Sequence, residues 1–348
     1  MLLEGLHLPL TTPFYPDGRL NLHKLEQNVA AYSKTPVSAI AVLSRNGEPT
    51  MLSDEETRQT LRAAVEAAAP EKVMLAGVSR NSVRGTLAIA DHAAALAYDA
   101  LLVAPPSLLQ AADSARQSKE LLIYFQAIAD RAALPIVLDG TAVALPVEMV
   151  IELAAHPRIL GLVDGQPTAE RIAHLKQATA GIKREVTVTP VFAAVTGRMQ
   201  TSQEAASMLS VKTLVGGGPA LTVLPAAPTI KTRTKVVGFQ ILSGKTSSML
   251  DALLAGAVGA MPAFAACAPQ ATYEVIAAWK DGDRALAEEK QERLQSAARY
   301  LEEEIGVAAI KFGCDLNGYF GGLPRLPLLP PGGEDRTQIE LLLQGLRN

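Results

Sequence analysis

The sequence is poor in aromatic residues and in cysteine, and it carries little net charge. Aromatic residues make up 4% of its 348 residues and apolar residues 49%, so the interior must be built from Ala, Val, Leu and Ile. That composition suits parallel strands covered by helices. The formal net charge is -3, and no basic cluster with interleaved aromatic residues occurs, so the sequence argues against nucleic acid as a partner.

The two cysteines, Cys267 and Cys314, are far apart in the sequence and have no histidine nearby. This spacing argues against a disulfide framework or a zinc site and fits a reducing, cytoplasmic setting. The apolar stretches are interrupted before they reach the roughly 18 residues that a bilayer span requires, so no membrane partner is predicted. The N-terminus has Glu4 and His7 within its apolar run and lacks a basic leader, so it predicts a first strand rather than a signal peptide.

Short apolar runs that end in Gly, Ser, Asp or Pro recur along the chain, separated by amphipathic, Ala-rich stretches. Each run is too short for a helix and mostly apolar on both faces, as a strand buried in a parallel sheet should be. The eight predicted strands begin at Leu6, Ser38, Lys72, Tyr98, Leu134, Ile159, Phe239 and Gly256. The stretches between them carry helix signals, such as the capping-box spacing of Ser53 and Glu56. Eight alternations predict either a (β/α)8 barrel or a doubly wound open sheet.

Two regions interrupt this alternation. Residues 181–237 are rich in Thr, Val and Ala and separate the sixth and seventh predicted strands by far more than any other pair, which predicts an insertion. Residues 266–348 predict a C-terminal extension of two or three helices, a proline-rich tail and a last short helix. We therefore expect a barrel over residues 1–265 that contains the insertion, with the helical extension packed on it.

An ordered series of motifs resembles one known family. The opening GLHLPLTTPFYPDGRLNLHKLEQNV, the run from Asn46 to Glu56, and the later stretches AIADRAALPIVL, HPRILGLVD, ILSG and GVAAIK resemble segments of the dihydrodipicolinate synthase and N-acetylneuraminate lyase family, in the same order. The series spans nearly the whole chain except the insertion. The resemblance favours a (β/α)8 TIM barrel of the α/β class. It also implies a lyase or aldolase that acts on pyruvate or a related 2-oxo acid without a cofactor, as a homodimer or homotetramer.

The residues that carry the family's reaction differ in this sequence. The resemblance places a Schiff-base lysine at the end of the sixth strand, where Val163 stands, and valine cannot act as a nucleophile. The family's proton-shuttling tyrosine corresponds to Asp139, and its threonine pair after the second strand corresponds to Arg45 and Asn46. After the fourth strand, Ser107 replaces a tyrosine by which family members share a site across subunits. Because these differences gather at the strand C-termini, where barrel active sites are built, we expect the usual chemistry to be lost or relocated.

The candidate catalytic residues are Lys245, Asp139 and Arg45. Lys245 follows the seventh strand, where it is either a relocated Schiff-base lysine with a neutral amine or a solvated lysine or anion contact. Asp139 and Arg45 are expected at the mouth of the barrel, where Asp139 acts as a general base or the two form a structural salt bridge. The predicted substrate contacts are Ser44, Asn46, Ser107, Gly244 and Met261.

The remaining polar residues predict no further site. The five histidines show no ligand spacing, so no metal is expected. Glu48 matches a family residue that supports its loop, and Asp164 should face away from the cavity if Val163 faces into it, because side chains alternate along a strand. Two functions stay open. One is a divergent lyase acting on a small 2-oxo acid or a related carbonyl compound. The other is a non-catalytic barrel that binds a small ligand or serves as a structural subunit, with the insertion covering the mouth or widening an oligomer contact.

Overall fold

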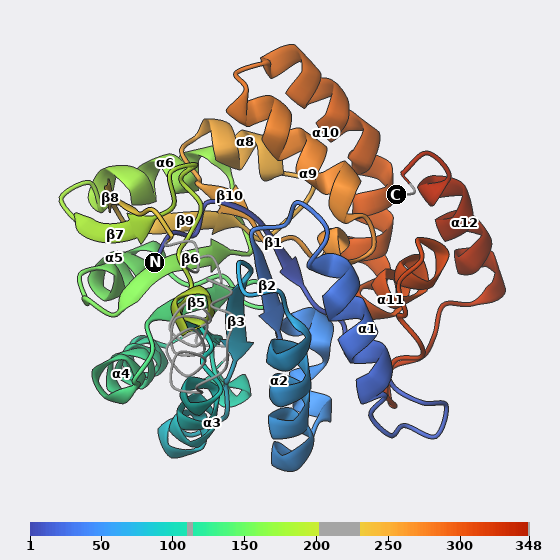
Figure 1. Ribbon diagram of the computed structural model, residues 1–348, viewed down its shortest axis with the longest axis horizontal. Helices are drawn as coiled ribbons and strands as arrows, with labels where there is room; N and C mark the ends of the chain where they lie inside the picture. Colours follow the sequence, from blue (N-terminus) through green and yellow to red (C-terminus); the bar gives the residue numbers. More distant parts are fainter. Residues whose placement is uncertain (110–113, 202–229, 347–348) are drawn as a thin grey trace, which may run out of the picture.

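The computed structural model describes residues 1–109, 114–201 and 230–346 and shows a closed parallel barrel ringed by helices (Figure 1). The barrel strands are β1 (Gly5–Pro9), β2 (Ala39–Val42), β3 (Val73–Gly77), β4 (Ala100–Val103), β5 (Ile136–Gly140), β6 (Ile159–Asp164), β9 (Gln240–Ser243) and β10 (Gly259–Ala260). Their order around the barrel is β1-β10-β9-β6-β5-β4-β3-β2. The predicted (β/α)8 barrel is therefore confirmed, and each of the eight predicted runs forms one of its strands.

Helices surround the barrel, and further helices form an extension at the C-terminal end of the chain. The helices that follow the first seven barrel strands are α1 (Leu22–Tyr32), α2 (Asp54–Ala67), α3 (Val83–Ala95), α4 (Ala115–Arg131), α5 (Val147–Ala154), α6 (Ala169–Ala178) and α8 (Met249–Leu254). The C-terminal extension comprises α9 (Pro269–Lys280), α10 (Arg284–Ala298), the π-helical segment η5 (Arg299–Ile305), α11 (Val307–Leu316) and α12 (Gly333–Leu343). Within the described ranges, no helix has the length and apolar character that crossing a membrane would require.

Local signals in the sequence set the ends of these elements. At the start of α2, the Ser53 hydroxyl accepts a hydrogen bond from the Glu56 backbone N–H, and the Glu56 carboxylate accepts one from the Ser53 N–H. These reciprocal bonds satisfy amide groups that the first helical turn leaves without partners. Inside the barrel, alternate strand residues such as Leu75, Leu102 and Val137 form an apolar cluster separate from the larger core between strands and helices.

The N-terminal residues close one end of this barrel interior. Leu3 belongs to the inner apolar cluster, and its backbone N–H donates to the Gln240 side chain at 2.7 Å. His7 is buried, and one of its ring nitrogens lies 2.9 Å from the Leu3 carbonyl oxygen. Burial lowers the pKa of His7 to about 4, so the ring is neutral near pH 7. The opposite end, formed by the carboxyl ends of the strands, is the mouth.

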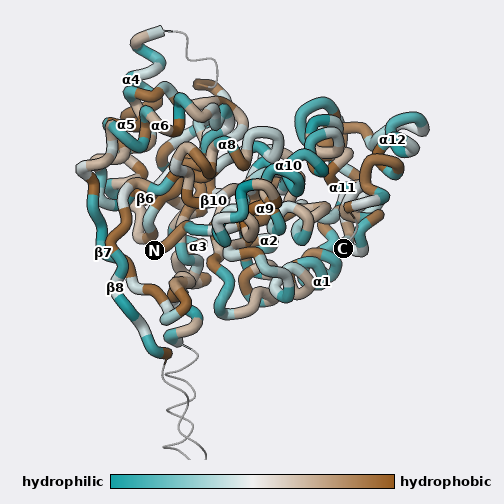
Figure 2. The backbone as a smooth tube through the Cα atoms, turned by 90° about the horizontal axis from the view of Figure 1, so that it is seen from above, coloured by the Kyte–Doolittle hydropathy of each residue, from teal (hydrophilic) through white to brown (hydrophobic). Residues whose placement is uncertain are grey.

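The predicted insertion at 181–237 begins and ends as an antiparallel pair of strands outside the barrel sheet. These are β7 (Arg184–Val188) and β8 (Arg233–Val237). In Figure 2 the two strands lie together at one edge of the molecule, beside the N-terminus. Residues 202–229, between them, lie outside the described residues.

Contacts of this insertion place it at the amino ends of the barrel strands. Arg184 donates a hydrogen bond at 2.9 Å to the carbonyl of His156, which precedes β6. Arg198 donates to the carbonyl of Lys72, which directly precedes β3. The expectation that the insertion covers the mouth is therefore wrong for its described residues, because they lie at the opposite end of the barrel.

Candidate active site

Asp139 lies at the carboxyl end of β5, opposite Val163 of β6 in the strand register. It is 5% exposed, and its Oδ1 accepts hydrogen bonds from the Thr141 backbone N–H at 2.9 Å and the Thr141 hydroxyl at 2.5 Å. Burial raises the pKa of this carboxyl, while the Thr141 hydrogen bonds and the positive charge of Arg45 act in the opposite direction. A buried carboxyl with a raised pKa at a barrel mouth is suited to proton exchange with a bound molecule.

The loop after β2 supplies Ser44 and Arg45 to the same end of the barrel. Arg45 begins the short 3-10 helix η1 (Arg45–Gly47) and is exposed. It acts on Asp139 through its charge, but the ion pairs within the described residues do not include a salt bridge between the two. Ser44 is buried at 3% exposure, and its hydroxyl has no hydrogen-bond partner in the described residues. Arg45 therefore keeps a charged group that a ligand at the mouth can use, whereas the hydroxyl of Ser44, a predicted substrate contact, is enclosed by the protein.

Asn46 and Glu48, in the same loop, have structural roles. The Asn46 side-chain amide donates to the carbonyls of Pro9 at 3.1 Å and Ala263 at 3.0 Å, which joins the loop after β2 to the end of β1 and to the loop after β10. Glu48 is buried, and its Oε1 lies 2.6 Å from Nζ of Lys311. The structure thus shows the predicted supporting role of Glu48, whereas both amide hydrogens of Asn46, a predicted substrate contact, are already donated within the protein.

Lys311, the partner of Glu48, is a buried structural residue that the sequence prediction did not name. Its side chain is 0% exposed, and Nζ also donates to the Leu323 carbonyl at 2.9 Å. Nζ lies 4.4 Å from the centre of the Phe14 ring. The available signal was a single lysine inside the apolar helical run VAAIKFG, since a charge at a core position must find a partner.

Val163 faces into the barrel beside Asp139. It is fully buried in the inner apolar cluster, together with Leu102, Leu242 and Met261. Met261, a predicted substrate contact, is 2% exposed in this cluster. The interior next to Asp139 is therefore apolar, which accounts for the burial that raises the pKa of its carboxyl.

The neighbouring residue Asp164 faces away from the interior, as predicted. Its Oδ2 lies 2.6 Å from Nε of Arg171 in α6, and the Asp164 side chain is 0% exposed. Gly244, another predicted contact, donates its N–H to the Asp164 carbonyl at 2.8 Å, and a Cβ at this position would lie 2.6 Å from that oxygen. Gly244 is therefore required by the close approach of two strands.

Lys245 lies near the C-terminal extension. Its Nζ is 3.6 Å from Oε2 of Glu303 in η5, and its side chain is 39% exposed. The next residue, Thr246, donates its hydroxyl to Glu302 at 2.6 Å, and burial raises the pKa of Glu302 to about 7. The structure brings Lys245 to Glu303, and none of the contacts within the described residues joins it to Asp139.

Ser107 is at the rim rather than in the interior. It begins the short helix η3 (Ser107–Leu109) and is exposed. Its N–H and its hydroxyl donate to the Asn81 side-chain oxygen at 2.9 and 2.7 Å, which joins the loops after β3 and β4. In the described part of the chain, no three His, Cys, Asp or Glu side chains gather as a metal site would require.

Known proteins match this chain along nearly its whole length. A family model described as the dihydrodipicolinate synthetase family matches residues 2–184 and 199–346. The 4-hydroxy-tetrahydrodipicolinate synthase of Acidiphilium cryptum is 24% identical over 349 residues, covering 99% of both chains. Dihydrodipicolinate synthase DapA-2 from Bacillus anthracis superposes with a TM-score of 0.77 at 18% identity, over 100% of both chains. YagE, a prophage protein of the dihydrodipicolinic acid synthase family from E. coli K12 in complex with pyruvate, has a TM-score of 0.75 at 22% identity, over 99% of both chains.

Proposed function

This chain belongs to the dihydrodipicolinate synthetase family, and from that membership we propose that its barrel mouth binds a small 2-oxo acid or a related carbonyl compound. The E. coli family member that holds pyruvate supports this class of ligand. In the proposal, Arg45 binds the ligand's carboxylate and Asp139 exchanges a proton with the ligand. The reaction is of the lyase type and proceeds without an imine at position 163.

The observation that carries the proposal is the carboxyl of Asp139. Its Oδ1 is occupied by Thr141, while Oδ2 has no hydrogen-bond partner in the described residues. With pyruvate as the ligand, one C3–H bond breaks, the proton moves to the Asp139 carboxylate, and the electron pair moves to the carbonyl oxygen to give an enolate. The guanidinium of Arg45 is the group that can stabilise this negative charge, more strongly in a partly apolar site than in water.

The usual amine nucleophile has no equivalent in this proposal. Val163 cannot form an imine, and the amine of Lys245 adjoins Glu303 instead of Asp139. The proposal therefore gives Lys245 a role in holding its loop against η5. This assignment predicts that no lysine of the chain is trapped by reduction in the presence of a 2-oxo acid.

A second function is favoured by the packing around Val163. The cluster of Val163, Leu102, Leu242 and Met261 fills the interior where the family's lysine is expected. A barrel filled in this way can bind a small ligand at its rim without acting on it. The alternative is a non-catalytic, ligand-binding barrel.

Proton exchange separates the two functions. The protein is incubated with pyruvate in D2O, and proton NMR follows the loss of the methyl signal. In parallel, the protein is treated with pyruvate and borohydride and analysed by mass spectrometry. The variants are Asp139→Asn, the exposed control Asp251→Asn on α8, and Val163→Lys, which introduces an amine at the family's lysine position. Burial lowers the pKa of such an amine, so Val163→Lys should give an adduct and validate the trapping.

The proposed function predicts methyl exchange by the wild type and by Asp251→Asn, loss of exchange in Asp139→Asn, and no adduct without Val163→Lys. Binding of pyruvate without exchange would favour the non-catalytic barrel. An adduct on Lys245 would overturn the assignment of the reaction to Asp139 alone. Absence of binding by pyruvate and by other small 2-oxo acids would contradict the proposed function.

A further inference from the structure

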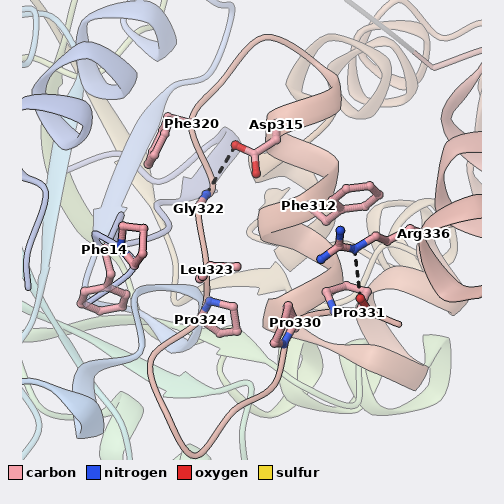
Figure 3. Close-up of a pocket in the computed structure, with 12 residues that line it drawn as sticks. Phe14, Phe312, Asp315, Phe320, Gly322, Leu323, Pro324, Pro330, Pro331 and Arg336 are labelled. Atoms are coloured by element: carbon pink, nitrogen blue, oxygen red, sulfur yellow. Dashed lines mark hydrogen bonds between the residues drawn. The ribbon is translucent and has the colours of Figure 1, made fainter. Parts of the chain in front are cut away.

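A cavity beside the C-terminal extension shares no lining residue with the Asp139 site. It has a volume of about 350 Å³ and is lined by residues of α11, by the start of α12 and by the loop that follows β1 (Figure 3). That volume falls within the range of small-molecule sites, which are mostly apolar with a few polar groups that orient the ligand. Phe14, Phe312 and Phe320 supply aromatic walls, and Pro324, Pro330 and Pro331 supply rigid apolar ones.

The lining of the cavity includes the guanidinium of Arg336, a residue that is exposed to solvent. Arg336, in the first turn of α12, donates its Nε to the Pro331 carbonyl at 3.0 Å and lies 5.5 Å from the centre of the Phe312 ring. Within the described residues, its two terminal NH2 groups have no hydrogen-bond partner. Figure 3 shows the guanidinium directed from α12 into the space beside Phe312 and Pro331. A planar guanidinium fixed in this way matches a carboxylate through two parallel hydrogen bonds.

The other charged residue of the lining, Asp315, sets the direction of a bound anion. One of its oxygens accepts the backbone N–H groups of Gly321 at 2.8 Å and Gly322 at 3.4 Å. Its negative charge disfavours a second carboxylate at that side of the cavity. An anionic group is therefore directed toward Arg336, and the rest of the ligand lies against the aromatic rings.

The walls are held in place before any ligand arrives. The ring of Phe14 lies 4.4 Å from Nζ of Lys311 and 4.3 Å from Cζ of Arg325, measured to the ring centre. The Lys311 amine donates a hydrogen bond to the Glu48 carboxylate, and the backbone N–H of Arg325 donates to the same carboxylate at 2.9 Å. Fixed walls reduce the conformational entropy that a ligand must remove on binding.

We propose that this cavity is a binding site for a small organic carboxylate with an aromatic body. Arg336 takes the carboxylate through its terminal NH2 groups, and the body lies against Phe312 and Phe320, which are both partly exposed. The site shares no lining residue with the Asp139 site and does not depend on the chemistry of Asp139.

The test uses the full chain and three probes that share one aromatic body. These are 3-phenylpropanoate, the neutral 3-phenylpropanamide and the cationic 3-phenylpropylamine, titrated by calorimetry and by NMR of the probe. The variants are Arg336→Gln and the matched control Arg284→Gln, an exposed arginine of α10 that pairs with Glu288. Arg45→Gln is included because a carboxylate could instead bind at the mouth. Thermal unfolding confirms that each variant is folded.

The carboxylate should bind the wild type and the Arg284→Gln and Arg45→Gln variants with equal affinity, and Arg336→Gln should weaken it at least about tenfold, since a charge-assisted hydrogen bond is lost. The amide should bind the wild type as weakly as the carboxylate binds the Arg336→Gln variant. The proposal is overturned if the carboxylate does not bind at millimolar concentration, if Arg336→Gln has no effect, or if the amine binds better. Loss of binding in Arg45→Gln alone would place the probe at the mouth and would also overturn it. Because binding is measured directly, failure here leaves the proton-exchange test of Asp139 unaffected.

Discussion

Replacing Lys311 with methionine removes a positive charge that the fold encloses completely. The side chains of Lys311 and Glu48 are 0% and 1% exposed, and their charged atoms are 2.6 Å apart. The Lys311 amine also donates to the Leu323 carbonyl at 2.9 Å. Methionine has a similar length and flexibility, so it can occupy the same space next to Phe14 without a large cavity.

The expected loss of stability comes mainly from the charge that is left behind. Breaking a buried ion pair by removing one partner costs about 3–5 kcal/mol, because the remaining carboxylate is uncompensated. Glu48 keeps only the Arg325 backbone N–H, at 2.9 Å, among its described hydrogen bonds. The double variant Lys311→Met/Glu48→Gln removes both charges, and replacing a whole buried pair is often nearly neutral. The double variant should therefore regain at least about 2 kcal/mol over the single one.

Urea unfolding measures this difference, followed by circular dichroism and by the fluorescence of the single tryptophan, Trp279. The control is Lys290→Met, because Lys290 is 25% exposed and lies 3.0 Å from Glu274. Such a partly exposed pair contributes less than about 1 kcal/mol. If Lys311→Met loses no more stability than Lys290→Met, or if the double variant is no more stable than the single one, enclosure of the charge is not what makes this pair important.

Three further predictions concern other parts of the fold. Burial raises the Glu302 pKa from 4.5 to about 7, so the stability that its protonated form contributes is present below pH 4.5 and is lost as the pH rises to 7. Glu302→Gln should therefore reduce the pH dependence of the thermal unfolding midpoint over this interval. An unchanged pH dependence would contradict the assignment. Ser53→Ala removes half of the α2 capping box and should lower the free energy of unfolding in urea by about 1 kcal/mol, whereas no measurable loss would mean that the cap is unimportant. Gly77→Ala would place a Cβ 2.0 Å from the Leu43 carbonyl oxygen and should abolish the folded circular dichroism spectrum, while Gly181→Ala, with no atom within 4 Å of the added Cβ, should melt like the wild type.

The eight strands were predictable from the sequence because a strand in this barrel is buried on both faces. The run ILGLVD forms β6 with all six residues buried, and the turn residues after it end the run. A composition dominated by Ala, Val, Leu and Ile leaves few other ways to bury such runs. The place of Asp139 at the mouth was also predictable, because a resemblance that fixes the strand also fixes its carboxyl end.

Contacts between distant segments were not predictable in the same way. The partner of Lys245, Glu303, lies on a π-helical segment 58 residues later in the chain, and no local pattern pairs the two. The location of the insertion at the amino ends of the strands depends on hydrogen bonds from Arg184 and Arg198 to backbone carbonyls. Backbone carbonyls occur at every residue, so the sequence holds no signal for which of them an arginine will select.

Closure of the barrel has a consequence for the growing chain. The first strand, β1, pairs with β2 on one side and on the other with β10, through Gly5 opposite Gly259. A nascent chain that has reached β6 therefore carries two open sheet edges, β1 and β6, which β9 and β10 cover only later. Unpaired edges are templates for pairing with other chains. Formation of the two-residue strand β10 thus removes the last open edges and ends the interval in which the nascent chain is prone to aggregate.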